Sequence, residues 1–286
     1  MKTVFITGAG GFIGKNIREQ LKDKYHLLTP SRKELNLLDK KQVDDYFTKK
    51  NIDVVVHSAL VGGSIKEQEV ATALSDNLRM FLNIVSNNGK FKKMIHLGSG
   101  AEYDKNRPLI KVKEDAFGKS IPQDDYSLFK YVSSKIIENY SNIVCLRIFG
   151  LFGKYDDYRL RFISNSICRN LFGLSITISQ NRVFDYMYID DLVKIIDYFI
   201  DHKASHTFYN MGAGSKIDLI TIAQFINSVS QKKSKIIVKK SGLGNQYTCD
   251  NSRLRKEIRN IHFTDPCEAI SKLLNWYTRH RKEIVL

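Results

Sequence analysis

The chain has 286 residues, enough for one large domain or for a large domain with a smaller companion. A net charge of +15 suits an anionic ligand, but basic pairs such as Lys40-Lys41 and Lys92-Lys93 are short and scattered, so no nucleic acid partner is expected. Four cysteines without a CxxC pair, and no apolar run of about 20 residues, argue against a disulfide framework, a metal site and a membrane span. We therefore expect a cytoplasmic protein.

The first elements predict a dinucleotide-binding turn. Val4 to Thr7 is typical of a short strand, and a helix is expected from Phe12 to Lys22. Between and within them stand Gly8, Gly11 and Gly14. Glycine permits a tight turn, lets backbone N–H groups approach a pyrophosphate, and allows close helix–strand packing. A purely structural glycine turn is the alternative, but the strand–turn–helix setting favours a nicotinamide dinucleotide.

The second strand, His26 to Thr29, is followed by a basic turn. Chains that bind NAD usually place Asp or Glu here, whereas this one has Ser31 and Arg32. Both residues suit the 2′-phosphate of NADP, so NADP(H) is favoured over NAD(H), with an exposed basic turn as the alternative. Asp39, a little further on, is a candidate contact for the adenine.

Three further apolar runs continue the rhythm of a parallel sheet wrapped by helices: Asp53 to Ser58, Lys93 to Gly98 and Asn142 to Arg147. Ser99 follows the second run, at the carboxyl end of a strand, where ligands sit in open α/β sheets. Its hydroxyl is a candidate to polarise a carbonyl. A loop serine that satisfies local backbone groups is the alternative.

Tyr126 and Lys130 lie four residues apart, on one face of a predicted helix. A free phenol has a pKa of about 10, and a nearby ammonium group lowers it. The pair therefore suits a tyrosine that exchanges a proton at neutral pH. In a chain with 14 tyrosines this spacing is a weak signal alone, but the glycine turn and Ser99 make it specific.

These elements predict an α/β fold: a Rossmann-type doubly wound parallel sheet with a smaller C-terminal substrate-binding domain. The dinucleotide-binding domain is expected to span residues 1–153 and about 181–212, and the substrate-binding domain residues 154–180 and 213–286. His57, at a strand end, and Trp276 with Tyr277, at helical spacing, are interpreted as packing residues.

In their order along the chain, the motifs resemble the extended short-chain dehydrogenase/reductase family, which acts mainly on nucleotide sugars. The resemblance covers nearly the whole chain and rests on Thr7 to Gly14, Ser99, Tyr126 with Lys130, Arg147 to Gly150, and Tyr188 to Asp191. Glu34 to Asp39 and Val61 to Gly63 are most similar to its GDP-L-fucose synthase branch. Enzymes of that branch use NADPH to epimerise and then reduce a 4-keto-6-deoxysugar.

The resemblance implies a role for each matching residue. Ser99 binds the C4 oxygen of the sugar, Tyr126 exchanges its proton, and Lys130 tunes Tyr126 and holds the nicotinamide ribose. The further cofactor contacts that the resemblance implies are Phe12, Ile13, Ser58, Ala59, Asn77 and Phe149. The substrate contacts are Gly100, Tyr103, Arg182, Phe184 and Asp185. Members of the family are commonly homodimers, and the same is expected here.

Departures from the family pattern narrow the reaction. Fucose synthases carry a cysteine two residues after the serine, and a histidine after the sixth strand, as an acid/base pair for epimerisation. Here Ala101 replaces the cysteine, and Lys154 to Ile163 contains no histidine. We therefore predict NADPH-dependent reduction at C4 of a nucleotide-linked 4-keto-6-deoxysugar. Phe184 stands where the family has an arginine that binds phosphate, and Arg182 is the candidate replacement.

Two other functions remain open from the sequence. One is a nucleotide-sugar 4-epimerase with tightly bound NAD. The other is a non-enzymatic protein that senses a dinucleotide or associates with RNA, for which the positive charge is the only argument. The joint presence of Ser99, Tyr126 and Lys130 favours an enzyme.

Overall fold

The computed structural model describes residues 1–62 and 70–285, which form two compact units. Gly63, part of one family motif, lies outside the described residues. The first unit comprises residues 1–104, 114–148 and 193–209. The second comprises residues 105–113, 149–192 and the described chain from 210 onward.

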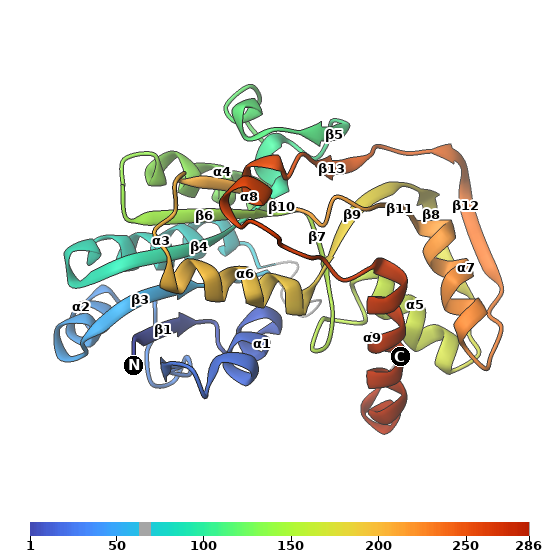
Figure 1. Cartoon of the computed structure of the whole chain (residues 1–286), viewed down its shortest axis with the longest axis horizontal. Helices are drawn as coiled ribbons and strands as arrows, with labels where there is room; N and C mark the ends of the chain where they lie inside the picture. Colours follow the sequence, from blue (N-terminus) through green and yellow to red (C-terminus); the bar gives the residue numbers. More distant parts are fainter. Residues whose placement is uncertain (63–69, 286) are drawn as a thin grey trace. The chain divides into compact units, whose positions relative to one another are not determined.

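The first unit is built on a six-stranded sheet with the order β10-β6-β4-β3-β1-β2 (Figure 1). The strands are β1 (Thr3–Thr7), β2 (His26–Leu28), β3 (Ile52–His57), β4 (Phe91–Ser99), β6 (Ile143–Ile148) and β10 (Phe208–Met211). The pairs β1–β2, β1–β3, β3–β4 and β4–β6 are parallel. The strand order reverses at β1, and ligands of such sheets bind outside the carboxyl ends of the strands near this point. The predicted Rossmann-type fold is confirmed.

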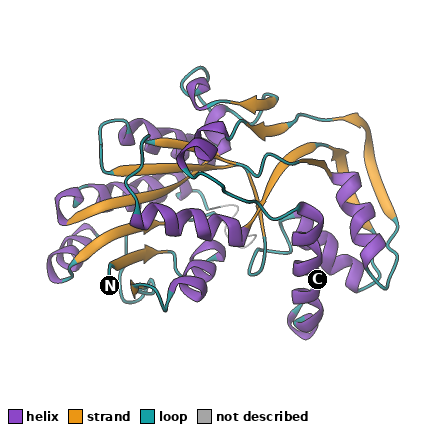
Figure 2. Cartoon of the chain, in the orientation of Figure 1, coloured by secondary structure: helices purple, strands orange, loops and turns teal. Residues whose placement is uncertain are grey.

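Helices alternate with these strands, as Figure 2 shows. They are α1 (Phe12–Leu21), α2 (Lys40–Lys49), α3 (Ala73–Val85), α4 (Asp125–Ile137) and α6 (Ile189–Asp201). Short 3₁₀ turns follow at η2 (Asn88–Lys90), η3 (Gly100–Tyr103) and η4 (Glu114–Ala116). Phe5 and Val55 of the sheet are fully buried together with Phe81 of α3, and Phe129 of α4 is 1% exposed. Burial of these side chains fixes α3 and α4 against the sheet.

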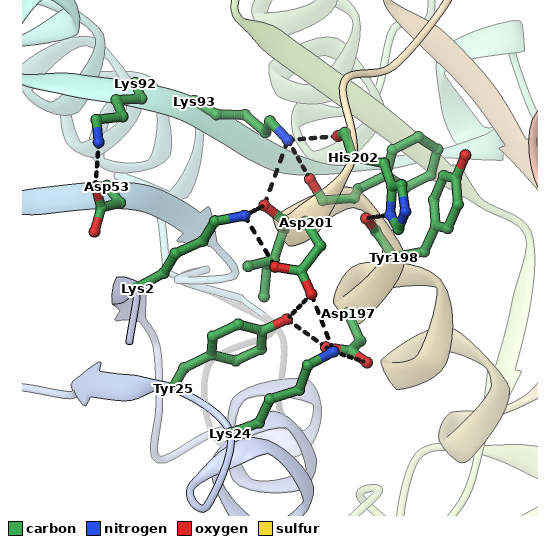
Figure 3. Close-up of polar contacts among 12 residues, drawn as sticks. Lys2, Lys24, Tyr25, Asp53, Lys92, Lys93, Asp197, Tyr198, Asp201 and His202 are labelled. Atoms are coloured by element: carbon green, nitrogen blue, oxygen red, sulfur yellow. Dashed lines mark hydrogen bonds and ion pairs between the residues drawn. The ribbon is translucent and has the colours of Figure 1, made fainter.

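Lysine side chains connect the C-terminal end of α6 to the sheet (Figure 3). The Lys93 ammonium donates to the carbonyl of Phe199 at 2.6 Å and also to that of His202. The Lys2 ammonium forms an ion pair with Asp201 at 2.9 Å. Positive charge at a helix C-terminus satisfies its free carbonyls and complements the helix dipole. These contacts therefore hold α6 on the first unit.

The second unit contains a five-stranded sheet, β11-β9-β13-β5 with β7 paired to β9, and a separate β12–β8 pair. The strands are β5 (Leu109–Val112), β7 (Gly150–Phe152), β8 (Ile176–Asn181), β9 (Val183–Tyr188), β11 (Lys216–Asp218), β12 (Ile236–Leu243) and β13 (Tyr247–Cys249). The helices are α5 (Phe162–Leu171), α7 (Leu219–Val229), α8 (Ser252–Glu257), α9 (Pro266–Arg279) and the 3₁₀ turn η5 (Arg281–Glu283).

The stretches 105–113, 149–153, 181–192 and 210–212 belong to this second unit, whereas the sequence analysis placed them with the dinucleotide-binding domain. The reason is strand pairing. β5 pairs with β13, and β9 pairs with β7, β11 and β13.

Side chains interpreted as packing residues lie in apolar surroundings. Tyr277 of α9 is 2% exposed, and the ring of Trp276 contacts that of Tyr155 at 5.4 Å. In the part of the chain that the structure describes, no helix is long and apolar enough to cross a membrane. Residues 1–62 and 70–285 also contain no group of three or more His, Cys, Asp or Glu side chains placed to hold a metal ion.

Candidate active site

A tight glycine turn joins β1 to α1. Gly8 has a φ of +67°, and the Gly11 N–H donates to the Gly8 carbonyl at 2.9 Å to close the turn. A Cβ atom at Gly14 would lie 2.3 Å from the Gly8 carbonyl oxygen, and one at Gly8 would lie 2.8 Å from the Cα atom of Ala59. Both positions therefore require glycine, as the dinucleotide-binding turn predicts.

Helix α1 begins directly after this turn. Gly11 is its N-cap, and no side chain of the described residues bonds the cap. The first N–H groups of the helix, those of Phe12 and Ile13, have no partner within the helix, because an α-helix leaves its first N–H groups unpaired. This geometry fits the pyrophosphate of a dinucleotide, which helix N-termini bind through such groups.

The carboxyl end of β3 lies against the glycine turn. The Thr7 hydroxyl accepts hydrogen bonds from the N–H groups of Ser58 and Ala59, both at 3.1 Å. The Asn77 side chain of α3 bonds both backbone groups of Val61, at 2.8 and 2.9 Å. The structure thus brings the predicted residues Ser58 and Ala59 beside Gly8, and Asn77 holds the chain that follows them at Val61.

His57 is part of this arrangement as a buried neutral group. Its Nδ1 lies 2.8 Å from the Thr7 hydroxyl, and its ring stacks on that of His96 at 5.5 Å. Burial lowers the pKa of His57 to about 3, and it also lowers the pKa of His96. These observations support the structural interpretation of His57.

The basic turn after β2 is exposed at Ser31 and Arg32. The Ser31 N–H donates to the Glu34 carboxylate at 2.7 Å, and this bond lowers the pKa of Glu34. Asp39 is the N-cap of α2, where its carboxylate accepts from the N–H of Gln42 at 3.0 Å. Asp39 therefore has a capping role. Its contact with adenine, and that of Arg32 with a 2′-phosphate, stay predictions.

Ser99 ends β4 and is the N-cap of η3. Its hydroxyl oxygen accepts from the Ala101 N–H at 3.1 Å, which leaves the hydroxyl proton available for another acceptor. Gly100, the next residue, is buried, and its contact with substrate stays a prediction. Tyr103, at the end of the same turn, is 6% exposed, and its hydroxyl accepts from Arg147 at 3.0 Å. Tyr103 thus packs inside the first unit, and its contact with substrate stays a prediction.

Tyr126 and Lys130 lie in the first half of α4, which packs against η3. Tyr126 is 38% exposed, whereas Lys130 is 6% exposed. The Lys130 ammonium lies 6.0 Å from the centroid of the Tyr126 ring and donates to the carbonyl of Leu97 at 2.6 Å. Burial lowers the pKa of Lys130 to about 8, while the Glu102 carboxylate acts in the opposite direction. The structure therefore holds Lys130 beside Tyr126 and against the strand that ends in Ser99.

The remaining predicted residues, Phe149, Arg182, Phe184 and Asp185, lie in the second unit. The rings of Phe149 and Phe184 pack on Tyr247, with centroids 4.9 and 6.0 Å away. Asp185 is 1% exposed and accepts backbone N–H groups of the loop after β10, although burial raises its pKa to about 6. The structure thus uses Asp185 to hold this loop. Contacts of these residues with cofactor or substrate stay predictions.

Arg182 is exposed and lines a hollow of about 360 Å³ within the second unit. The other lining residues come from the start of α5, from β8 and from the start of α7. Polar and apolar side chains both contribute, among them Gln180 and Phe162.

Glu102 is a buried residue of the site that the sequence analysis did not identify. It is fully buried, accepts from the Ser99 N–H at 2.8 Å, and pairs with Arg147 at 2.7 Å. A signal was available, because Ser99 followed by a glutamate three residues later matches the S-x-x-E capping box. The partner Arg147 had been noted only as part of a family motif.

Comparison with known proteins adds the following findings. The model of the NAD dependent epimerase/dehydratase family matches residues 4–212. A GDP-L-colitose synthase of Yersinia pseudotuberculosis is 25% identical over 263 residues, which cover 83% of this chain and 85% of that protein. The GDP-L-fucose synthase of Escherichia coli K12 is 25% identical over 269 residues, covering 82% and 83%. A solved GDP-mannoheptose C4 reductase from Campylobacter jejuni with NADP bound has a similar fold, with a TM-score of 0.82 at 20% identity, covering 97% of this chain and 98% of that one.

Proposed function

The chain belongs to the NAD dependent epimerase/dehydratase family, and from this membership we propose that it uses NADPH to reduce a nucleotide-linked 4-keto-6-deoxysugar at C4. It is an NAD(P)-dependent enzyme of the short-chain dehydrogenase/reductase type that acts on nucleotide sugars. The proposal rests on one observation above all: Lys130 is buried beside Tyr126 and bonded to the strand that presents Ser99. The names of the relatives, two GDP-sugar synthases, support the same substrate class.

A nicotinamide dinucleotide fits the glycine turn, and when bound it supplies the hydride. The chain's own groups would do the rest. The Ser99 hydroxyl proton would polarise the C4 carbonyl, and Tyr126, whose ring is partly exposed, would protonate the oxygen as it becomes an alkoxide. The Lys130 ammonium beside the phenol favours release of that proton.

Reduction is preferred to epimerisation because of what surrounds Ser99. Ala101 is 2% exposed, and its methyl group has no proton to exchange. Residues 154–163 contain no histidine. Asp156, in that segment, has its pKa raised to about 7 by burial, but it is 5% exposed and accepts from the N–H of Asp157 at 3.0 Å. Asp156 is thus held as a structural group.

For the nucleotide, we assign Arg182 and its hollow as the diphosphate and base subsite. Phe184 cannot contact phosphate by charge, whereas the exposed Arg182 guanidinium offers the paired donors that phosphate oxygens accept. For the cofactor, the exposed Arg32 supports NADPH.

The test is NADPH oxidation, followed by nicotinamide absorbance, with a panel of GDP-, CDP- and dTDP-linked 4-keto-6-deoxysugars. Tyr126→Phe should lower kcat by roughly 10²–10⁴-fold, the range for a lost general acid. The matched control is Tyr140→Phe, the same change just beyond the end of α4, which should leave kcat unchanged. Turnover that survives in Tyr126→Phe would contradict the assigned role. No oxidation of NADPH with any sugar, together with NAD that co-purifies, would favour the 4-epimerase.

A further inference from the structure

One buried carboxylate joins the chain segments that carry the candidate catalytic groups. Glu102 is 0% exposed. One of its oxygens accepts from the Ser99 N–H at 2.8 Å. The other accepts from the Ser134 hydroxyl at 2.6 Å and from Nε of Arg147 at 2.7 Å. Glu102 therefore connects the end of β4 to the helix that carries Lys130 and to β6.

Its partner Arg147 is enclosed by aromatic rings. The guanidinium carbon lies 4.1 Å from the ring centroid of Phe117 and 4.3 Å from that of Phe208, and Nη1 donates to Tyr103. A buried ion pair of this kind is weak support for stability, since well-packed apolar residues of similar volume often serve as well. The stability of the fold therefore does not by itself explain the buried ion pair between Arg147 and Glu102.

The charges around Lys130 indicate that role. The ionisable groups that interact with it, from α4, β3, β4, β6 and η3, are Tyr126, His57, His96, Cys145 and Glu102. Burial keeps both histidines neutral by lowering their pKa values, and it raises the pKa of Cys145 to about 12, so that this thiol is neutral too. Glu102 is the first of the groups that favour the ammonium form of Lys130 against the effect of burial.

We propose that Glu102 is a positioning residue of this site: it fixes the backbone of Ser99 and keeps Lys130 in its ammonium form beside Tyr126. The part of this inference that concerns turnover rests on the proposed reductase function, whereas the part that concerns the protonation of Lys130 does not. The hydrogen bonds and the buried pair belong to the first unit alone, so the effect on Lys130 is measurable in the whole protein without substrate.

The direct test is an NMR titration of the protein labelled with [6-¹³C]lysine, in which the Lys130 signal is assigned by its absence from Lys130→Met. Glu102→Gln keeps the size of the side chain and removes its charge. It should move the Lys130 midpoint to lower pH by roughly one unit. The matched control Ser134→Ala removes one hydrogen bond from the same carboxylate without changing its charge. It should leave the midpoint in place.

Turnover gives a second measurement. In Glu102→Gln the decline of kcat at high pH should move to lower pH by the same amount, with KM for NADPH nearly unchanged. A mere loss of packing would lower kcat at all pH values equally. An unmoved Lys130 midpoint in folded Glu102→Gln overturns the proposal.

Glu102→Asp decides the matter if Glu102→Gln does not fold. It retains the charge but shortens the reach to Ser99. It should therefore leave the Lys130 midpoint near its wild-type value while lowering kcat several-fold, and an unchanged kcat would overturn the positioning role. Absence of turnover in the wild-type protein would refute the proposed function, whereas the Lys130 titration would still decide the effect of Glu102.

Discussion

The glycine turn offers the sharpest test of the cofactor site, through Gly14→Ala. The new methyl group would lie 2.3 Å from the Gly8 carbonyl oxygen and 2.6 Å from the Cα atom of Ala9. These are backbone atoms, which cannot rotate away as a flexible side chain can. Because ordinary contact begins at 3.4 Å, α1 and the turn must separate by about 1 Å.

The cost follows from this displacement. Overpacking of a tight site typically destabilises a protein by about 1–3 kcal/mol. The same movement shifts the N–H groups at the start of α1 away from the position that suits a pyrophosphate. Since about 1.4 kcal/mol corresponds to a factor of ten in affinity, we expect the Kd for NADPH to rise at least tenfold. The melting temperature should fall as well.

Nicotinamide fluorescence titration measures the Kd, and thermal unfolding measures stability. The matched control is Gly10→Ala in the same turn, where a Cβ atom would have nothing within 4 Å. Gly10→Ala should leave the melting temperature unchanged. If Gly14→Ala bound NADPH as tightly as the wild-type protein, the close approach of α1 to the turn would not govern cofactor binding, and the reasoning would be refuted.

Three other predictions follow from single side chains. Lys93→Met removes hydrogen bonds to three carbonyls at the end of α6 and should lower the free energy of unfolding by about 1–2 kcal/mol in urea titrations. Lys92→Met, whose side chain is 82% exposed, should change it little. Arg32→Ala should weaken NADPH binding by about tenfold or more, with NADH binding unchanged. If the affinities for NADPH and NADH fell equally, the contact of Arg32 with the 2′-phosphate would be contradicted. Burial lowers the pKa of Lys130 to about 8, below its value of about 10.4 in the unfolded chain. The native state therefore releases this proton first, and the stability of the wild-type protein relative to Lys130→Met should rise between these pH values; a constant difference would contradict the buried ammonium.

Local signals predicted most of the first unit. Each apolar run between Val4 and Arg147 that was interpreted as a strand is one, and the glycine turn has the expected backbone geometry. These features depend on residues close in sequence, so periodicity and glycine spacing are enough to find them. The pair of Tyr126 and Lys130 was found for the same reason, since four residues bring two side chains together on a helix.

Contacts between residues far apart in the chain could not be predicted from the sequence. β5 joined the second unit because Leu109 pairs with Tyr247, and no local pattern reports a partner so distant. Asp185 was expected to contact the substrate. In the structure its carboxylate accepts a hydrogen bond from an N–H group of the loop after β10. Glu102 reaches Arg147 only because β4 and β6 are neighbours in the sheet, with Gly98 opposite Arg147.

The electrostatic balance of the first unit connects its stability with its chemistry. Lys130 and Arg147 are two buried cations, and the Glu102 carboxylate opposes the loss of the proton from each. Taking such groups out of water costs free energy that apolar residues would not incur. Lys130→Met should accordingly raise the free energy of unfolding at pH 7 while abolishing reduction. This part of the structure thus carries a cost in stability at pH 7, and the Glu102 carboxylate favours the ammonium form of Lys130 against the effect of burial.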